Sequence, residues 1–115
     1  MAYQNLDQQF IAGQWQPGRS QKMIQNLNPY TQDTIFTLQA ASTADVDAAY
    51  AAADKAFQQG VIKSVELRQQ ILQKLQQVIQ ARQDKIIDWL ILESGSTRFK
   101  AGLEVGAALS IIQES

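Results

Sequence analysis

The sequence predicts an α+β arrangement in which a short β-rich segment precedes a longer helical one. Up to residue 41, aromatic and β-branched residues occur in short runs separated by turn-forming residues. From residue 42 onward, apolar residues recur every three or four positions, which is the spacing of an amphipathic helix. We therefore divide the chain into an extended, hairpin-forming segment (residues 1–41) and a helical segment (residues 42–115).

Three short strands are expected in the first segment. Residues 10–15 (FIAGQW) and residues 23–27 (MIQNL) are two of them, and the loop with Pro17 and Gly18 would join them as a hairpin. Residues 28–31 (NPYT) predict a turn, because proline fixes its own φ and pushes the residue before it toward an extended conformation. Residues 34–38 (TIFTL) form the third strand by propensity.

Three or four helices are expected in the second segment. Ser42 is a candidate N-cap with Asp45 as its capping-box partner, and Gly60 is placed to end this first helix. Ser64 caps the next helix, which we expect to kink or break at the polar residues 82–84.

The last helical segment follows a stop at residues 93–96 (ESGS) and contains several small residues that would let another element approach closely. It remains apolar as far as Ile112 without a stop signal. This pattern suggests that the chain is part of a larger fold.

The composition limits the possible chemistry. The chain has no cysteine and no histidine. Thiolate nucleophiles, an imidazole base and zinc or iron sites ligated by cysteine or histidine are therefore excluded from it. Carboxylates, lysine and tyrosine remain, and these need a pocket that shifts their pKa values before they can serve in acid–base catalysis.

The charge pattern indicates which partners to expect. The net charge is −1, with 10 basic and 11 acidic residues, and no basic stripe with interleaved aromatics is present. Nucleic-acid binding is therefore not expected. The apolar runs are too short for a membrane span, and residues 1–5 lack the pattern of a signal peptide. We expect a soluble, cytoplasmic protein with no membrane partner.

Two acidic features could carry chemistry, and each has a plainer explanation. Residues 93–96 place a carboxylate beside hydroxyls, but a helix stop explains them better. Asp45 and Asp47 could bind a cation, yet acids in a first helical turn already stabilise the helix dipole.

Aromatic, basic and amide side chains are the remaining candidates. Trp15 and Trp89 could stack on a ligand, although such residues more often pack in a core or an interface. Arg98 and Lys100 could attract an anion or be surface charges. A glutamine-rich helix face could be a recognition surface, but an uncharged solvent face is the simpler interpretation. This face comprises Gln69, Gln70, Gln73, Gln76, Gln77, Gln80 and Gln83.

The order of the local patterns is more informative than any one of them. Residues 10–15 read aromatic-Ile-x-Gly-x-Trp, residues 28–31 read Asn-Pro-x-Thr, and residues 42–49 read STADVDAA. In this order they resemble the opening of NAD(P)-dependent aldehyde dehydrogenases. The resemblance continues at Ala52, Ala56, Phe57, Arg68, Ile71, Leu72, Arg82, residues 93–95, Glu104 and Val105.

The chain departs from the family pattern at three places. Gln32 stands where the family usually has glycine, which suggests a different turn. Residues 58–61 (QQGV) lack the usual tryptophan and proline, and Ser96 and Thr97 replace the usual Lys-Pro. The run at residues 93–98 (ESGSTR) looks more like the branch that acts on benzaldehyde-type aromatic aldehydes.

The resemblance implies an α+β fragment of the α/β aldehyde dehydrogenase fold, from the N-terminal part of an enzyme that oxidises an aldehyde to a carboxylic acid with NAD or NADP. In the family, the nucleophilic cysteine, the general-base glutamate and the cofactor-binding glycine motif lie further along the chain. No catalytic or cofactor-binding residue is therefore assigned here. We expect this chain alone to be inactive and to bind no cofactor, and the intact enzyme to take an aldehyde substrate and to form a homo-oligomer.

Two weaker sites also follow from the resemblance. A monovalent cation that some members hold would fall on Asn26, Leu27 and Glu93, although a backbone turn and a solvated acid explain these positions more simply. Oxygen ligands of this kind suit a hard cation. The helix after Gly95 lines the substrate tunnel in the family, which points to Glu104 and Ala108.

The alternative is a free-standing helical module that binds a partner protein without catalysis. The two hypotheses differ over residues 103–112. A self-sufficient module would cover the apolar face of this segment within the chain, whereas a part of a larger enzyme would leave it bare and prone to self-association.

Overall fold

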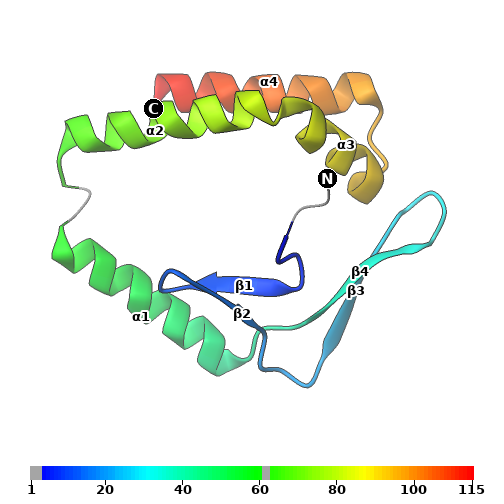
Figure 1. The fold of residues 1–115 in the computed structure, drawn as a ribbon, viewed down its shortest axis with the longest axis horizontal. Helices are drawn as coiled ribbons and strands as arrows, with labels where there is room; N and C mark the ends of the chain where they lie inside the picture. Colours follow the sequence, from blue (N-terminus) through cyan, green and yellow to red (C-terminus); the bar gives the residue numbers. More distant parts are fainter. Residues whose placement is uncertain (1–3, 61–62) are drawn as a thin grey trace. The chain divides into compact units, whose positions relative to one another are not determined.

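The chain folds into four short strands followed by four helices, and the computed structural model describes residues 4–60 and 63–115. Figure 1 shows their order: β1 (Gln8–Ile11), β2 (Gln14–Pro17), β3 (Met23–Leu27), β4 (Thr34–Gln39), α1 (Thr43–Gln59), α2 (Val65–Ala81), α3 (Gln83–Ser94) and α4 (Arg98–Glu114). The expected β-rich segment followed by helices is confirmed, with four strands in the described residues where three were expected. Two sequence-based predictions lie partly outside the described residues. They concern residues 1–3, which belong to the stretch without a signal-peptide pattern, and Val61, which belongs to the run at residues 58–61 that departs from the family pattern.

Contacts divide the chain into two compact units. The first contains the four strands and α1, and the second contains the turn Asn28–Gln32 together with α2, α3 and α4. Contacts thus group α1 with the strands. The predicted division into residues 1–41 and 42–115 describes how these segments would pack in an intact enzyme. That division stays a prediction.

The first hairpin corrects the strand pairing expected from the sequence. β1 pairs with β2 in an antiparallel register that places Phe10 opposite Trp15 and Ile11 opposite Gln14. Ala12 and Gly13 form the turn between them with φ values of 52° and 82°. Positive φ at both central residues is typical of the tight turns that match the twist of a hairpin. Residues 10–15 therefore form a strand, a turn and a strand, not one strand.

The second hairpin pairs β3 with β4, so β3 does not pair with residues 10–15 as expected. Ile24 lies opposite Leu38, and the register shifts between Asn26 and Leu27. The expected third strand is present and extends to Gln39. In the described part of the chain each sheet has two strands.

The N-terminus of α1 is capped as predicted. The backbone N–H of Asp45 donates to Ser42 Oγ over 3.2 Å, and the backbone N–H of Ser42 donates to Asp45 Oδ2 over 2.8 Å. These two bonds are both halves of a capping box. Gly60 ends the helix in the left-handed conformation, with a φ of 69°.

Asp45 also anchors the loop that follows β2. Its carboxylate accepts a hydrogen bond from the backbone N–H of Arg19 over 2.9 Å and forms an ion pair with Arg19 Nε. The carboxylate is buried, with only 1% of the residue exposed. Hydrogen bonds from Ser42 and Arg19 hold the pKa of Asp45 well below its usual range, against the opposing effect of burial. A charged group is buried here because it is fully paired.

Gly18 lets this loop approach the end of β4. A Cβ atom at Gly18 would lie 2.2 Å from the carbonyl oxygen of Gln39 and 2.3 Å from that of Ala40. The two segments are bonded next to this point, because the N–H of Ser20 donates to the Ala40 carbonyl over 3.0 Å. Only a residue without a side chain fits.

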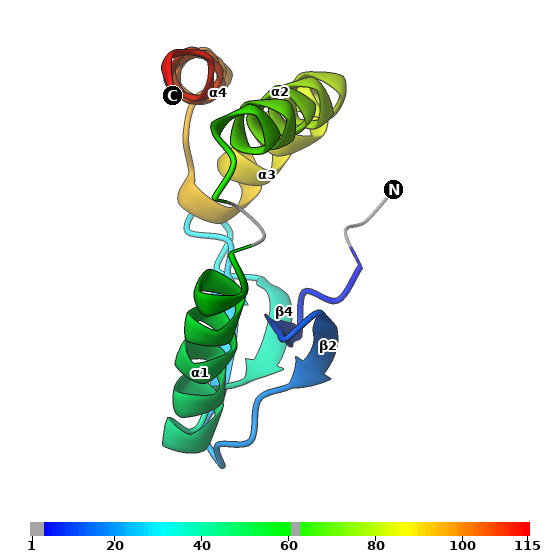
Figure 2. The same cartoon turned by 90° about the vertical axis from the view of Figure 1, so that its left-hand side faces the viewer.

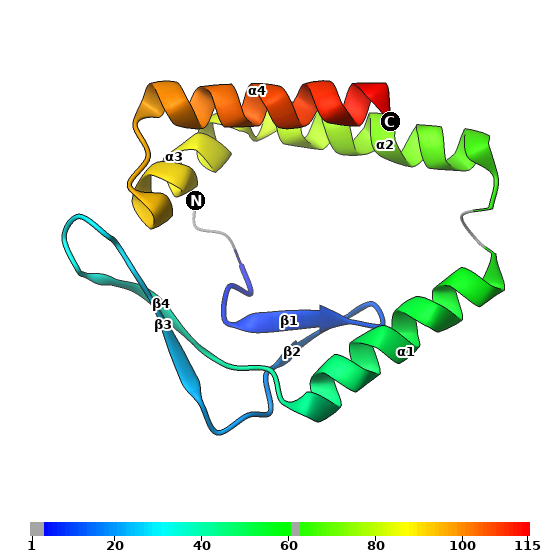
Figure 3. The same ribbon diagram turned by 180° about the vertical axis from the view of Figure 1, so that it is seen from behind.

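In the second unit, α4 runs back along α2 and α3, which Figures 1 and 3 show from opposite sides. Its core is formed by Ile87, Ala101 and Val105. The partly buried residues packed against this core are Ile79, Ile86, Leu90, Ile91 and Leu109. The expected break falls at Arg82, which ends α2 and precedes α3.

Among the described residues, no helix combines the length and the apolar character needed to cross a bilayer.

We predict that Gly18→Ala lowers the free energy of unfolding by about 3 kcal/mol, at the upper end of the cost of overpacking, because the new methyl group overlaps two backbone oxygens. Chemical denaturation of the protein measures the change. Gln21→Ala, an exposed position in the same loop, is the control and should change the stability by less than about 0.5 kcal/mol. Equal effects of the two substitutions would contradict the close approach at Gly18.

Asp45 should also make the free energy of unfolding depend on pH in the acid range. Its pKa in the folded state is lowered, so the stabilisation is complete above the unfolded-state pKa of about 4 and is lost as the pH falls below it. We expect Asp45→Asn to reduce stability at neutral pH and to flatten the acid limb of a stability profile. Asp47→Asn, also near the start of α1, is the matched control and should keep the acid limb. Identical profiles for the two variants would show that Asp45 is not the responsible group.

Candidate functional site

The turn Asn28–Gln32 is the first component of the candidate site in the second unit. Asn28 Oδ1 accepts hydrogen bonds from the backbone N–H of Tyr30 over 2.9 Å and of Thr31 over 3.2 Å. The N–H of Gln32 closes the turn on the Asn28 carbonyl over 2.8 Å. Gln32 has a φ of 65°, a conformation that favours glycine. The backbone at Gln32 therefore has the conformation that a glycine would adopt at this position. The different turn that was expected from Gln32 is not needed.

Gly95 is the second component. It ends α3 in the left-handed conformation, with a φ of 68°, and its N–H donates to the Ile91 carbonyl over 3.1 Å. A Cβ atom at Gly95 would lie 3.1 Å from Pro29 Cγ. The proline of the turn thus packs directly against the end of α3, and residues 93–96 act as the helix stop that the sequence predicted.

A surface pocket of about 410 Å³ lies where these two components meet. Its apolar lining comes from Ile91 and Leu92, while an ion pair of 2.5 Å between Arg98 Nη2 and Asp88 Oδ1 contributes the charged lining. The complete lining is Asn28, Tyr30, Asp88, Ile91, Leu92, Gly95, Ser96 and Arg98. None of these side chains is a thiolate or an imidazole. The Ser96 hydroxyl lies 3.0 Å from Ser94 Oγ and accepts a hydrogen bond from Lys100 Nζ over 3.4 Å, and Lys100 also pairs with Glu104. The pocket can hold a small group.

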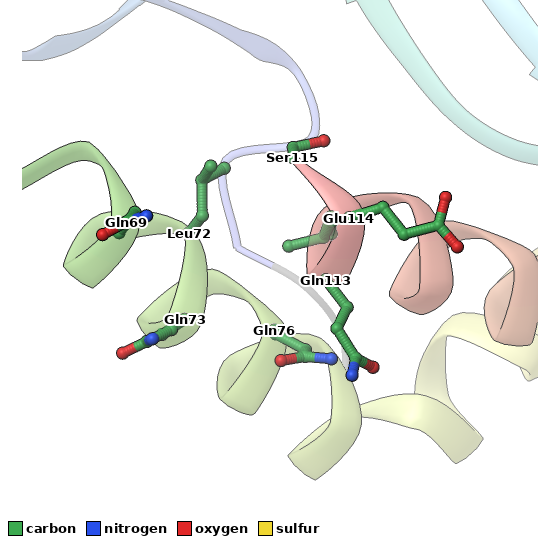
Figure 4. A pocket seen from close by; sticks show the side chains of 8 residues that line it. Gln69, Leu72, Gln73, Gln76, Gln113, Glu114 and Ser115 are labelled. Carbon is green, nitrogen blue, oxygen red and sulfur yellow. The ribbon is translucent and has the colours of Figure 1, made fainter. Parts of the chain in front are cut away.

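A second pocket of about 560 Å³ lies between α2 and the end of α4. Four of the eight lining residues are glutamines, and Figure 4 shows Gln76 of α2 and Gln113 of α4 reaching toward the same space. The lining residues are Gln69, Leu72, Gln73, Gln76, Ile112, Gln113, Glu114 and Ser115. Part of the glutamine-rich face of α2 therefore lines this groove. Neutral amides donate and accept hydrogen bonds but do not transfer protons in catalysis.

The pKa shifts in the described residues do not favour acid–base catalysis. The Ser64 hydroxyl donates to Glu66 Oε2 over 2.7 Å and lowers the pKa of Glu66. The pKa of Asp45 is lowered as well. A carboxyl group that acts as a general acid near neutral pH needs the opposite shift, which burial in an apolar site produces.

The candidate cation ligands belong to different units. Asn26 and Leu27 lie in β3, where the register of the second hairpin shifts, and Glu93 lies near the end of α3. Among the described residues, no group of three or more acidic side chains is placed to hold a metal ion. The cation site, which would use backbone oxygens as well as Glu93, stays a prediction.

The two tunnel candidates lie on one side of α4. Glu104 and Ala108 are four residues apart, so they share a face of the helix, and both are exposed. Glu104 Oε1 forms an ion pair of 2.7 Å with Lys100 Nζ. Their role in a substrate tunnel stays a prediction.

The structure also locates the other candidates. Asp45 has its carboxylate occupied by Ser42 and Arg19, which supports the structural interpretation over cation binding. Trp15 packs against Phe10 across the first hairpin, with 5.0 Å between ring centroids, and Trp89 is half-buried on α3. Both Arg98 and Lys100 are paired with acidic residues. Of these residues, Arg98 lines the candidate pocket.

The described residues also do not fit a dinucleotide cofactor. A cofactor's phosphates are held where a glycine-rich turn leads from a strand into the N-terminus of a helix. The glycines at positive φ have other positions, because Gly13 lies in the first hairpin and Gly60 and Gly95 end helices. The four described helices begin after Ser42, Ser64, Arg82 and Thr97.

Sequence reasoning missed Arg19 and the tight constraint on Gly18. Arg19 meets Asp45 across 26 residues of sequence. Local patterns contain no signal for such a pair. The isolated glycine at position 13 was the available signal for the missed hairpin turn.

Comparison with known proteins decides the family. The sequence profile described as the aldehyde dehydrogenase family matches residues 15–115. The chain belongs to the aldehyde dehydrogenase family. It is 42% identical to a vanillin dehydrogenase of Corynebacterium glutamicum over 91% of this chain, and 39% identical to a benzaldehyde dehydrogenase of Bacillus subtilis over 98% of it. The resemblance inferred from the order of motifs is confirmed.

Solved structures agree with this family assignment. An NAD-dependent benzaldehyde dehydrogenase from Corynebacterium glutamicum matches 94% of this chain with a TM-score of 0.90 and 40% identity. A protein described as a possible aldehyde dehydrogenase from Bacillus subtilis matches 99% with a TM-score of 0.92 and 31% identity. The fold class, a fragment of the aldehyde dehydrogenase fold, is therefore confirmed.

The chain spans only 22% and 23% of the two curated relatives, and 24% and 25% of the two solved structures. Consistent with a larger fold, the apolar residues of the segment 103–112 are covered only in part by the described part of the chain, because Val105 is buried but Leu103 is 60% exposed and Ile111 is 65% exposed. The exposed part of this segment argues against the self-sufficient interaction module.

Gly95→Ala should lower the free energy of unfolding by about 1–2 kcal/mol, because a residue with a Cβ atom is strained at this φ and would press against Pro29. Thermal or chemical denaturation measures the change. Ser96→Ala, the neighbouring position, lacks the positive φ and serves as the control, with an effect below about 0.5 kcal/mol. An unchanged stability for Gly95→Ala would show that this turn is not constrained.

Proposed function

We propose that this chain is the N-terminal part of an NAD- or NADP-dependent aldehyde dehydrogenase that oxidises aromatic aldehydes to carboxylic acids. The family match over residues 15–115 carries the proposal. The aromatic substrate class is supported by the identities of 42% and 39% to enzymes described as vanillin and benzaldehyde dehydrogenases. The sequence run at residues 93–98 supports the same class.

The isolated chain would be inactive. Oxidation of an aldehyde through a covalent thioester requires a thiolate, and this chain has no cysteine. Its carboxyl groups with lowered pKa values do not replace that nucleophile. The nucleophile, the general base and the cofactor site therefore belong to the larger part of the enzyme. NAD is the first cofactor to test, because the related benzaldehyde dehydrogenase structure is described as NAD-dependent.

The role of this chain in the enzyme would be structural. Asp45 fixes the loop after β2 to α1, and the contact of Pro29 with Gly95 fixes the turn to the end of α3. Both constraints hold backbone segments in defined places without moving a proton. Such precision matters because catalytic groups elsewhere in an enzyme depend on a rigid support.

Three further features belong to this proposal. A monovalent cation would bind the backbone at Asn26 and Leu27 together with Glu93, and Glu104 and Ala108 would line the path of the aldehyde. The enzyme would form a homo-oligomer in the cytoplasm. Removal of monovalent cations and substitution of Glu93 are the means of testing the first of these.

Activity measurements on the complete gene product test the proposal. We expect reduction of NAD or NADP with benzaldehyde and vanillin, and a kcat/KM at least about tenfold higher than with acetaldehyde, since a pocket shaped for an aromatic ring gains more than about 1.4 kcal/mol from it. The isolated chain, assayed in the same way, is the control and should show no turnover.

Other results would overturn the enzyme proposal or its substrate class. A native gene product that ends at Ser115, or a longer product without aldehyde oxidation, would overturn the enzyme proposal. Preference for acetaldehyde would overturn only the aromatic substrate class.

A further inference from the structure

We propose that the pocket between the turn Asn28–Gln32 and the connection from α3 to α4 is a binding site for uncharged aromatic compounds that carry an oxygen acceptor. Aromatic aldehydes belong to this class, whereas aromatic carboxylates do not. The inference goes beyond the proposed function, which gives this chain a structural role only.

The two segments that form the pocket are held in place by their own contacts. All of the lining residues belong to the second unit. The backbone N–H of Tyr30 donates to Asn28 Oδ1 over 2.9 Å, and Pro29 packs against Gly95. Figure 2 shows the short connection that leads from the end of α3 to the start of α4. The volume of about 410 Å³ lies within the usual range of sites for small molecules.

The apolar part of the lining favours a ligand with a ring. Ile91 is half-buried and Leu92 is 39% exposed, so both keep apolar surface that a ligand can cover. Tyr30 adds an aromatic side chain from the turn, and it is 92% exposed. Packing among the described residues therefore does not account for the position of its ring. Aromatic rings attract each other in offset or edge-to-face arrangements, so a ring in the pocket would be stabilised by Tyr30.

The ion pair between Arg98 and Asp88 sets the charge of the ligand. These are the two charged residues of the lining, and their charges cancel. A carboxylate that approached Arg98 would be repelled by Asp88, and a cation that approached Asp88 would be repelled by Arg98. An uncharged ligand avoids both repulsions.

Arg98 is also the donor for the oxygen acceptor of the ligand. The other polar groups of the lining serve local structure, because Asn28 Oδ1 accepts backbone N–H groups of the turn and the Ser96 hydroxyl accepts a bond from Lys100 Nζ over 3.4 Å. The guanidinium group has five N–H donors, and its bond to Asp88 uses Nη2. Another N–H of the same group can therefore donate to a carbonyl oxygen.

Binding of 4-bromobenzamide to the complete gene product tests the inference. This probe is uncharged, carries a carbonyl acceptor and has no aldehyde to oxidise. We expect the anomalous signal of its bromine in the pocket of soaked crystals. In solution, Tyr30→Ala should weaken binding about fivefold in calorimetric titrations, because an aromatic contact is lost. Tyr50→Ala removes an exposed tyrosine of α1 outside the lining, so it is the matched control and should leave the affinity unchanged.

A second comparison tests the charge of the ligand. We expect 4-bromobenzoate to bind at least about tenfold more weakly than 4-bromobenzamide, because Asp88 repels its carboxylate. Equal or tighter binding of the benzoate would overturn the assigned ligand class.

The remaining outcomes also decide the matter. Absence of bromine from the pocket would overturn the inference, including the case in which another part of the polypeptide fills this space. A bromine peak combined with equal affinities of the Tyr30→Ala and Tyr50→Ala variants would mean binding at crystal concentration only, and would overturn it as well. If Tyr30→Ala does not fold, Arg98→Gln takes its place, with a similar expected loss of affinity. Aldehyde oxidation by the unmodified enzyme, measured separately, reports on the proposed function alone.

Discussion

The buried carboxylate of Asp45 is the interaction on which the first unit depends. It closes the capping box at the start of α1 and also binds the backbone and side chain of Arg19, so one side chain connects the loop after β2 to a helix that begins 24 residues after Arg19 along the chain. Burial of a charge is unfavourable unless it is paired, and here every contact favours the charged form. The loop can approach closely enough only because Gly18 has no side chain.

The second unit depends on a different kind of constraint. Its core is small, with Ile87, Ala101 and Val105 fully buried, and α4 supplies two of these three residues. The opposite side of α4 remains apolar and exposed. Within the described residues this side of α4 is not covered, and the segment matches about a quarter of the related structure. The exposed apolar residues are therefore the expected boundary with the rest of an aldehyde dehydrogenase, as the proposed function requires.

Helix ends were predictable because their causes are local. Ser42, Ser64 and Gly95 act on backbone groups within four residues, so the sequence around each is sufficient to identify it. The strand pairing was not predictable in the same way. Glycine at position 13 permitted a turn, but a strand and a tight hairpin share the same aromatic-rich composition, and only the observed register distinguishes them. The motifs at residues 28–31 and 93–95 were recognised from the sequence, but their meeting at Pro29 and Gly95 was not predicted, because it joins residues 66 positions apart.

The sequence by itself determined the family, the absence of a thiol nucleophile and the positions of the helix caps, because each follows from residue identity or from interactions over a few residues. Only the tertiary structure decided which strands pair, that Arg19 binds Asp45, and that Gly18 and Gly95 sit against another segment of the backbone or a proline ring. The contacts of Gly18, Arg19 and Gly95 join residues 21 to 66 positions apart, and no local pattern records which distant group a side chain meets. Long-range pairing is a property of the folded chain as a whole.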